Sequence, residues 1–180
     1  MATDLGEFLA RYAPAAEEEL AWSRGQLRLR VACYLSEDLP PLDYVTSVRS
    51  LVFQGRQVLV VRNEAEAHIW PGGRREEGEA LEQTLRREVL EETGWEVAPI
   101  SRLGFVRYRH LTPRPPEYRY PYPEFMQVIY ASTAIASRPE ARISDDYEIE
   151  SAFRPINQAR ALGITLCQKV LLDSARYLLL

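Results

Sequence analysis

Apolar and polar residues alternate along this chain with two different periods, and the change of period separates expected strands from expected helices. In residues 26–35, apolar side chains alternate with arginines, the period-two pattern of a strand with one buried face. Residues 44–63 contain two runs rich in β-branched side chains around Gly55, which predicts a β-hairpin. Three further strands are expected over residues 101–111, 126–136 and 147–155.

Helical spacing, with apolar positions three or four residues apart, occurs at both ends of the chain and in its middle. Pro14 separates two expected N-terminal helices, and Gly94 is a natural end for the central one because glycine readily adopts a left-handed conformation. The C-terminal helix is expected to break near Gly163. The helical segments are 4–12, 15–24, 79–93 and 156–179.

The order of these elements predicts an α+β protein with mixed β-sheets between helices. The main domain is expected over residues 44–180, preceded by an extension over 1–43 that is helical and then a strand. The extension is a candidate dimerisation element, so a homodimer stays open. Between two expected strands, the proline-rich "TPRPPEYRYPYPEF" (112–125) predicts a loop, because proline lacks the backbone donor that a strand needs.

Composition narrows the class of protein. The 180 residues are 46% hydrophobic and 27% charged, which is typical of a globular protein, and the net charge of -4 argues against a partner such as nucleic acid or an anionic membrane. The sequence begins without a basic, apolar signal and has no run of about 18 apolar residues, so a cytoplasmic protein is expected. The two cysteines, Cys33 and Cys167, have no CxxC spacing and are expected to be buried thiols.

The central helix carries an unusual group of carboxylates. Glu88, Glu91 and Glu92 lie three and four residues apart and project from one side of it, where each like-charged pair costs about a few tenths of a kcal/mol. A divalent cation between them reverses that repulsion, since Mg²⁺ binds carboxylate oxygens together with substrate phosphates. The alternative is a solvated charged helix with pairs such as Glu82 with Arg86.

The positions around this helix decide between the two interpretations, because they match the complete signature of the Nudix family. The chain resembles a Nudix hydrolase over about residues 44–178, and the Nudix fold is therefore expected. One departure is Trp95, where the family usually has an aliphatic residue. The matching positions are Gly73, Glu79, Arg87, Glu88, Val89, Glu91, Glu92, Gly94 and Trp95.

The resemblance implies an activity, a cofactor and a set of ligands. Family members hydrolyse a nucleoside diphosphate linked to another group, by attack of water on phosphorus with Mg²⁺ or Mn²⁺. By position, Glu88, Glu91 and Glu92 are implied as metal ligands together with the carbonyl oxygen of Gly73. Glu91 is further implied to bridge the metal and the attacking water and to act as base.

The resemblance implies Glu91, Glu88 and Arg87 as the catalytic residues. Arg87 is expected to orient a glutamate, and Glu79 either to pair with Arg87 or to lie near a metal. A general base from outside the motif stays open. Its candidates are Glu117, Glu124, Asp145, Asp146 and Glu148.

Substrate choice is expected to lie in the loop 112–125. Tyr118 and Tyr120 offer flat rings for a nucleobase, and Arg114 or Arg119 offers a guanidinium for a phosphate or ribose. The alternative is a rigid surface loop or a subunit contact. The isolated histidines, His68 and His110, are expected to be structural hydrogen-bonding groups.

Two other functions fit the sequence less well than a pyrophosphohydrolase does. A non-catalytic Nudix-fold module that binds a nucleotide would be expected to lose one or more of the glutamates, and this chain retains all of them. An isomerase of allylic diphosphates needs a reactive cysteine, and neither Cys33 nor Cys167 lies near the motif in sequence. The sequence leaves the particular nucleoside diphosphate derivative open.

Overall fold

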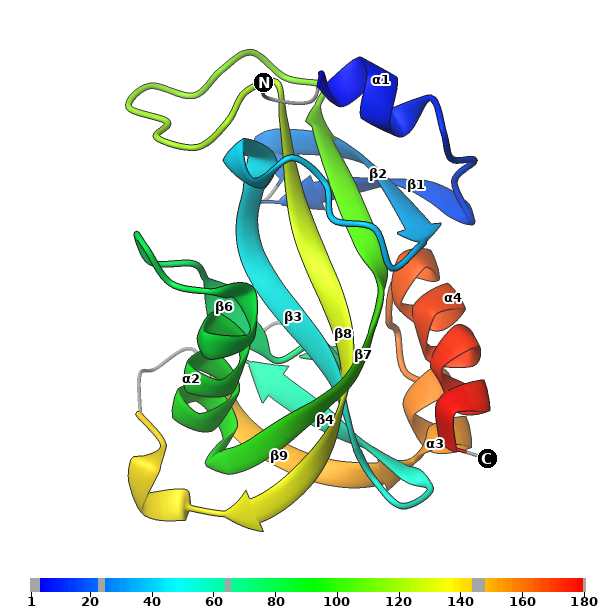
Figure 1. Ribbon diagram of the computed structural model, residues 1–180, viewed down its shortest axis with the longest axis vertical. Helices are drawn as coiled ribbons and strands as arrows, with labels where there is room; N and C mark the ends of the chain where they lie inside the picture. The colour runs from blue at the N-terminus through cyan, green and yellow to red at the C-terminus, as the bar shows by residue number, and fades with distance from the viewer. Residues whose placement is uncertain (1–3, 23–24, 64–65, 144–147, 180) are drawn as a thin grey trace.

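The computed structural model describes residues 4–22, 25–63, 66–143 and 148–179 (Figure 1). Within these ranges the strands form one nine-stranded sheet in the order β1-β2-β7-β8-β3-β4-β5, with β6 paired to β3 and β9 paired to β4. The strands are β1 (Ala16–Trp22), β2 (Leu27–Leu35), β3 (Val45–Gln54), β4 (Gln57–Asn63), β5 (Ala67–His68), β6 (Gly72–Arg74), β7 (Trp95–His110), β8 (Glu124–Ser137) and β9 (Glu148–Pro155). The helices are α1 (Leu5–Leu9), α2 (Leu81–Thr93), α3 (Ile156–Arg160) and α4 (Leu166–Ala175), with 3₁₀ turns at Leu42–Tyr44, Pro139–Ala141 and Arg176–Leu179.

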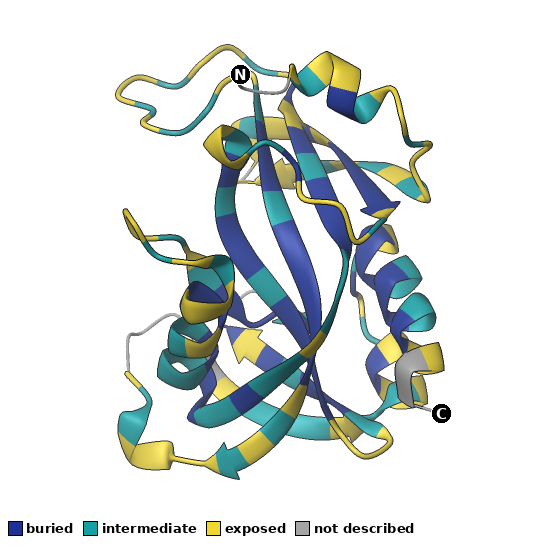
Figure 2. Ribbon diagram, in the orientation of Figure 1, coloured by how far each residue is buried: buried dark blue, intermediate teal, exposed yellow. Residues whose placement is uncertain are grey.

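The sheet is mixed, and helices cover both of its faces, which confirms the predicted fold class. β3 and β8 pair in parallel, whereas the other paired strands run antiparallel. Figure 1 shows α2 and α4 on opposite sides of the strongly twisted strands β3, β7 and β8. Figure 2 shows that burial is greatest along these central strands.

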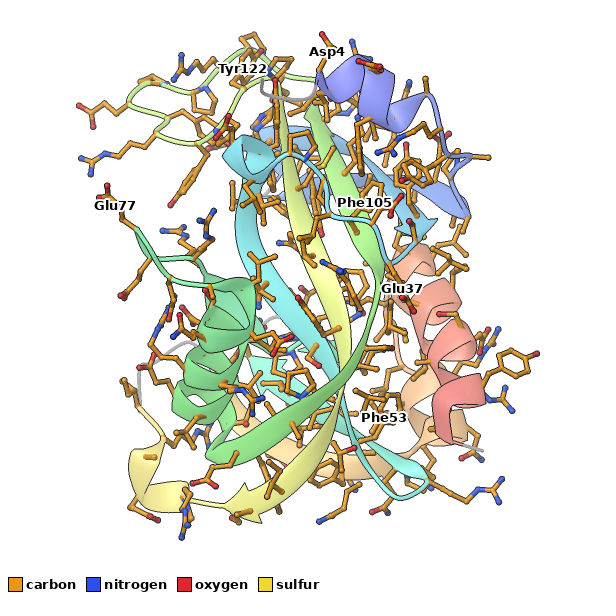
Figure 3. The ribbon with its side chains drawn as sticks, in the orientation of Figure 1. Asp4, Glu37, Phe53, Glu77, Phe105 and Tyr122 are labelled. Atoms are coloured by element: carbon orange, nitrogen blue, oxygen red, sulfur yellow. The ribbon has the colours of Figure 1, made fainter. Side chains whose placement is uncertain are left out.

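Strand β3 explains why its sequence is almost continuously apolar. Val48 and Val52 pack in the core beneath α2, while Leu51 and Phe53 pack in the core beneath α4. A strand covered on both faces needs apolar residues on both. A third cluster lies beneath α1, where the rings of Phe8 and Phe105 are 5.3 Å apart; Figure 3 shows Phe53 and Phe105 well separated along the sheet.

Several predicted turns and ends are confirmed. Gly55, at φ 56°, joins β3 to β4, and Gly94, at φ 73°, ends α2 with its N–H donating to the Leu90 carbonyl over 2.8 Å. The C-terminal segment is broken between α3 and α4, as expected around Gly163. Both cysteines are free and buried, as predicted.

One predicted helix is wrong: residues 16–22 form strand β1. They pair with β2, from Ala16 opposite Cys33 to Trp22 opposite Leu27. The side chain of Glu18 accepts hydrogen bonds from the first two amides of α4, at Leu166 (3.1 Å) and Cys167 (2.9 Å). The ladder with β2 and this helix-capping contact are tertiary interactions, and they override the helix propensity of alanine and glutamate.

Strand β7 also begins earlier than expected, at Trp95 instead of residue 101. Pro99 lies within it, where the pairing with β8 is irregular between Pro99 and Ser101, and an irregularity of this kind accommodates a residue without a backbone donor. None of the helices in the described ranges is long and apolar enough to cross a membrane.

Candidate active site

The short strand β6 brings the glycine turn against the glutamate helix. Gly73 pairs with Val48 of β3, and a β-carbon on Gly73 would lie 2.0 Å from Oε2 of Glu88. A β-carbon on Gly72, at φ 131°, would lie 2.3 Å from the Val48 carbonyl oxygen. The backbone therefore excludes a side chain at Gly72, whereas a side chain at Gly73 would displace the carboxylate of Glu88.

Arg87 lies at the centre of the charged groups on α2. Its Nη1 donates to Oε1 of Glu88 over 2.9 Å and to Oε2 of Glu91 over 3.2 Å. Its Nε and Nη2 each donate to Glu79 over 2.9 Å, and Nη2 also donates to the carbonyl of Arg74 over 3.1 Å. One guanidinium thus holds three carboxylates and ties the helix to β6.

Glu79 is the most strongly held of these acids. Hydrogen bonds from Arg87 lower the pKa of Glu79 to about 2, and Thr84 adds a hydrogen bond of 2.8 Å from its hydroxyl. The same interaction raises the pKa of Arg87. Glu79 therefore stays ionised and fixes the arginine, while the carboxylates of Glu88 and Glu91 lie on the other side of the guanidinium.

Glu92 contacts the backbone of Gly72. Its Oε2 accepts a hydrogen bond of 2.5 Å from the backbone N–H of Gly72. The side chain links the helix to β6, as Arg87 does, but from a separate position. Across the described part of the chain, no three acidic, histidine or cysteine side chains are placed together as ligands of one ion.

A cavity of about 590 Å³ adjoins this cluster at Arg74. Arg74 lines it, and the carbonyl of the same residue receives the hydrogen bond from Arg87. Six of its sixteen lining residues are Trp, Tyr or Phe, for which we call it the aromatic cavity, and Arg49 and Arg74 are its two arginines. The lining residues are Trp22, Leu27, Thr46, Ser47, Arg49, Asn63, Glu66, His68, Trp70, Arg74, Tyr108, Tyr118, Tyr120, Phe125, Gln127 and Gln168.

The two tyrosines predicted for the substrate lie in this cavity, whereas the two arginines do not line it. The guanidinium of Arg74 lies 4.7 Å from the centre of the Tyr120 ring. Arg114 is exposed and donates to the carbonyl of Tyr118 over 2.9 Å, and Arg119 is exposed as well. The loop 111–123 therefore directs Tyr118 and Tyr120 toward the cavity and these arginines outward.

A comparison with family models settles the family. The NUDIX domain model matches residues 43–173, most of the chain. The chain belongs to the NUDIX family. This confirms the resemblance and the hydrolase class, and the signature positions described above are its Nudix box.

Solved structures agree on the fold. A NUDIX hydrolase from Nitrosomonas europaea is 19% identical with a TM-score of 0.59, over 74% of this chain and 89% of that one. The Bacillus subtilis pyrophosphohydrolase BsRppH is 22% identical, also with a TM-score of 0.59, over 89% of this chain and 95% of that one. No curated protein matches the sequence significantly.

Two of the carboxylates considered as a base outside the Nudix box, Glu124 and Glu117, have side chains that the structure describes. Glu124 is held by Arg107 through hydrogen bonds of 2.9 and 2.5 Å, and only 12% of its side chain is exposed. Glu117 is exposed in the loop. Asp145 and Asp146 lie outside the described residues, as does the side chain of Glu148.

Both histidines make structural contacts. Nδ1 of His68 accepts a hydrogen bond of 3.3 Å from the N–H of Trp70. His110 is buried, its Nε2 shares a hydrogen bond of 2.9 Å with the hydroxyl of Tyr118, and burial lowers its pKa. His110 thereby supports a tyrosine of the cavity wall.

Sequence reasoning missed most of the cavity. Ser47, Trp70, Gln127 and Gln168 come from β3, the segment after β5, β8 and α4. Trp70 stands directly before the Nudix box, in "HIWPGG", and this proximity is a signal that could have identified it. Gln168 lies in an amphipathic helix and has no such signal.

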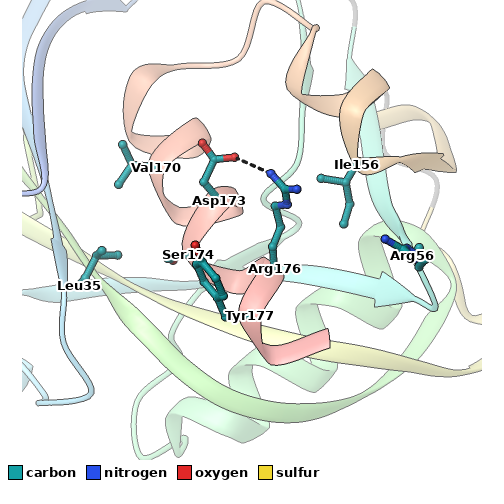
Figure 4. A pocket seen from close by; sticks show the side chains of 8 residues that line it. All are labelled: Leu35, Arg56, Ile156, Val170, Asp173, Ser174, Arg176 and Tyr177. Carbon is teal, nitrogen blue, oxygen red and sulfur yellow. Dashed lines mark ion pairs between the residues drawn. The ribbon is translucent and has the colours of Figure 1, made fainter. Parts of the chain in front are cut away.

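A second cavity, of about 630 Å³, lies beside α4 and away from the Nudix box (Figure 4). It is an open surface hollow, since Leu35 and Tyr177 on its edge are 48% and 80% exposed. Its charged side chains include Asp173 and Arg176, which pair with each other over 3.9 Å. Nothing at this site adjoins the glutamates, so the aromatic cavity is the candidate substrate site.

Proposed function

We propose that this Nudix hydrolase cleaves the pyrophosphate bond of a nucleoside diphosphate linked to another moiety, with water attacking phosphorus and Mg²⁺ or Mn²⁺ as cofactor. The observation that carries the proposal is the junction at Arg74. Its backbone carbonyl is bound by Arg87 in the glutamate cluster, and the same residue lines the aromatic cavity. This shared residue supports a substrate that binds in the cavity and extends its phosphates past Arg74 toward the carboxylates.

In chemical type the donor groups fit a hard divalent cation, although Glu92 is placed apart from Glu88 and Glu91. Glu88, Glu91 and Glu92 supply carboxylate oxygens, and the carboxylate of Glu88 lies against Gly73, whose carbonyl is a further oxygen donor. These oxygens are the ligands that Mg²⁺ and Mn²⁺ prefer. A bound ion would neutralise pyrophosphate charge and lower the pKa of the attacking water.

The protein's own residues accept the proton from water and hold the carboxylates in position. Glu91 has the most exposed carboxylate of the three that Arg87 contacts, with 35% of its side chain accessible against 22% for Glu88 and 14% for Glu79. It is therefore the best placed of them to accept a proton from water. Arg87 holds Glu88 and Glu91 in position, and Glu79 in turn holds Arg87.

The cavity contributes charge as well as shape. Arg49 and Arg74 line it, and Arg49 is fixed by a hydrogen bond of 3.2 Å from Nη1 to the carbonyl of Trp70. Two guanidinium groups favour an anionic substrate such as a diphosphate. The structural likeness to a pyrophosphohydrolase, BsRppH, supports the same reaction class.

The test is a panel of nucleoside diphosphate derivatives, such as nucleoside diphosphate sugars, dinucleoside polyphosphates and nucleoside triphosphates, assayed with Mg²⁺, with Mn²⁺ and with EDTA. Release of a phosphomonoester or of pyrophosphate should require a divalent ion and should be fastest for a subset of the panel. Hydrolysis in ¹⁸O-labelled water should place the label on a product phosphate. A chain that cleaves no member of the panel with either ion contradicts the proposal.

A further inference from the structure

A third cavity, of about 360 Å³, is lined by three arginines from separate parts of the fold, and we call it the arginine hollow. Arg56 lies in the turn between β3 and β4, Arg160 is the last residue of α3, and Arg176 begins the 3₁₀ turn after α4. Among the described residues, six line the hollow and none of them is acidic. They are Arg56, Pro155, Ile156, Asn157, Arg160 and Arg176.

Positive charge is in excess around the arginine hollow. Asp173 pairs with two of the arginines: it accepts hydrogen bonds of 3.0, 3.2 and 2.9 Å from Arg160, and its Oδ1 lies 3.9 Å from Nη1 of Arg176. Arg56 is exposed, and no carboxylate in the described ranges pairs with it. One carboxylate thus serves three guanidinium groups, which leaves an excess of positive charge in a chain whose net charge is -4.

The two ion pairs of Asp173 differ in strength. Arg160 binds the carboxylate through Nε and Nη2, a bidentate geometry that fixes its guanidinium. The pair with Arg176 is longer, and with 59% of the arginine side chain exposed it contributes little. Arg56 and Arg176 are therefore free to bind a further anion next to Arg160. Arginine suits a phosphate group because its planar set of donors matches the phosphate oxygens.

The arginine hollow adjoins the larger cavity beside α4. The two share Arg56, Ile156 and Arg176, and Figure 4 shows Ile156 between the two arginines. The larger cavity adds apolar surface from Leu35 and Val170, over which an apolar group attached to the anion can extend. Within the described residues, neither cavity shares a lining residue with the aromatic cavity beside the Nudix box.

We propose that the arginine hollow is a second binding site, separate from the Nudix box, for a phosphate group that is either free or carried as an ester by a small molecule. Arg56, Arg160 and Arg176 donate to the phosphate oxygens, and Asn157 contributes a side-chain amide. Phosphate matches the excess of positive charge better than a carboxylate does, since it carries about two negative charges near pH 7. The alternative is a group of solvated arginines that binds no ligand. The proposal does not depend on the proposed function.

The experiment measures how fast phenylglyoxal modifies individual arginines of the full chain in EDTA, by mass spectrometry of its peptides. For a Kd of about 1 mM, about 10 mM inorganic phosphate should slow the modification of Arg56 and Arg176 about tenfold, relative to sodium chloride at equal ionic strength. Arg11 is the matched control and should be modified at an unchanged rate. Its side chain is 54% exposed and lies 3.9 Å from Asp38, an exposure and an ion-pair distance close to those of Arg176.

A substitution separates binding in the hollow from a general effect of phosphate. Arg56→Gln should reduce the protection of Arg176 to about twofold, because loss of one charged hydrogen bond weakens anion binding about tenfold. Arg11→Gln should leave that protection at its full value. Both positions are exposed, so both variants are expected to fold.

Phenyl phosphate distinguishes the two sources of the phosphate group. Stronger protection by phenyl phosphate than by inorganic phosphate assigns the hollow to an ester with an apolar group, and equal or weaker protection assigns it to free phosphate. Two results overturn the proposal. In the first, phosphate slows the modification of Arg11 as much as that of Arg176, or slows neither. In the second, Arg56→Gln leaves the protection of Arg176 unchanged.

Discussion

The glutamate cluster on α2 and the aromatic cavity beside it lie on either side of Arg74, yet they are built in opposite ways. The cluster comes from the short stretch Gly72–Glu92, and its charges are paired internally through Arg87. The cavity draws on residues from Trp22 to Gln168, and some polar atoms of these residues have no hydrogen-bond partner within the described part of the chain. In the proposed function, the residues of the reaction are thus close together in the sequence, whereas the residues of substrate choice come from the whole fold.

This difference implies that the two regions can be disabled separately. Substitutions in the cluster should affect turnover for every substrate, because each substrate presents the same diphosphate. Substitutions in the cavity should change the ranking of substrates. The predictions below test that separation, beginning with the largest expected effect.

Glu91→Gln should lower kcat by about two to four orders of magnitude, the range typical for loss of a general base, with little change in Tm. The amide keeps the size of the side chain but cannot accept the proton. The matched control is Glu82→Gln, an exposed position on the same helix, which should retain activity. Equal kcat values in Glu91→Gln and Glu82→Gln would remove Glu91 from the mechanism.

Arg87→Met should lower kcat for all substrates by a similar factor, and it should also lower the Tm. It leaves Glu79, Glu88 and Glu91 without their shared cation, at a cost of about 1–3 kcal/mol for the lost charged hydrogen bonds. At about 2–4 °C per kcal/mol, calorimetry should detect the decrease readily.

Magnesium provides a second measurement on the same variant. If the carboxylates bind the ion, Mg²⁺ should raise the Tm of Arg87→Met more than that of the wild type, because the ion then relieves their repulsion. A Tm that does not respond to Mg²⁺ or Mn²⁺ in either protein would count against these carboxylates as ligands.

Tyr120→Ala should raise KM for one nucleotide about fivefold or more relative to another, with a small change in kcat. Loss of a stacking ring costs about 1–3 kcal/mol, and this ring lines the cavity beneath Arg74. Tyr177→Ala, at a tyrosine that is 80% exposed beside α4, is the control. A uniform change across the nucleotide panel would instead favour a structural role for the loop.

The smallest effect is expected from Glu79→Gln, and it depends on pH. Arg87 lowers the pKa of Glu79 from 4.5 to about 2, so the carboxylate stabilises the fold above about pH 4.5 and loses that contribution as the pH falls toward 2. The Tm difference between wild type and Glu79→Gln should therefore be largest near pH 7 and shrink by pH 2.5. A constant difference would show that the ion pair does not contribute to stability.

How far the sequence predicts the structure varies between regions for identifiable reasons. The helix ending at Gly94, the hairpin at Gly55 and the broken C-terminal helix were predictable, because each depends on spacing within one segment. Strand β1 was not predictable, because the Ala–Glu-rich residues 16–22 favour a helix until they pair with β2. The contacts of Glu18 were not predictable either, since its hydrogen-bond partners are about 150 residues away in α4.

The candidate site also has a part that the sequence predicts and a part that it does not. The sequence alone determined the Nudix box, because its glycines and glutamates act at fixed spacings along one turn and one helix. Only the tertiary structure decided that Tyr120 faces the cavity while Arg119 faces solvent, and that Gln168 and Trp70 meet there. The physical reason is distance along the chain. A helix repeats every 3.6 residues and can be predicted from local spacing, whereas a cavity wall depends on how distant strands and helices pack.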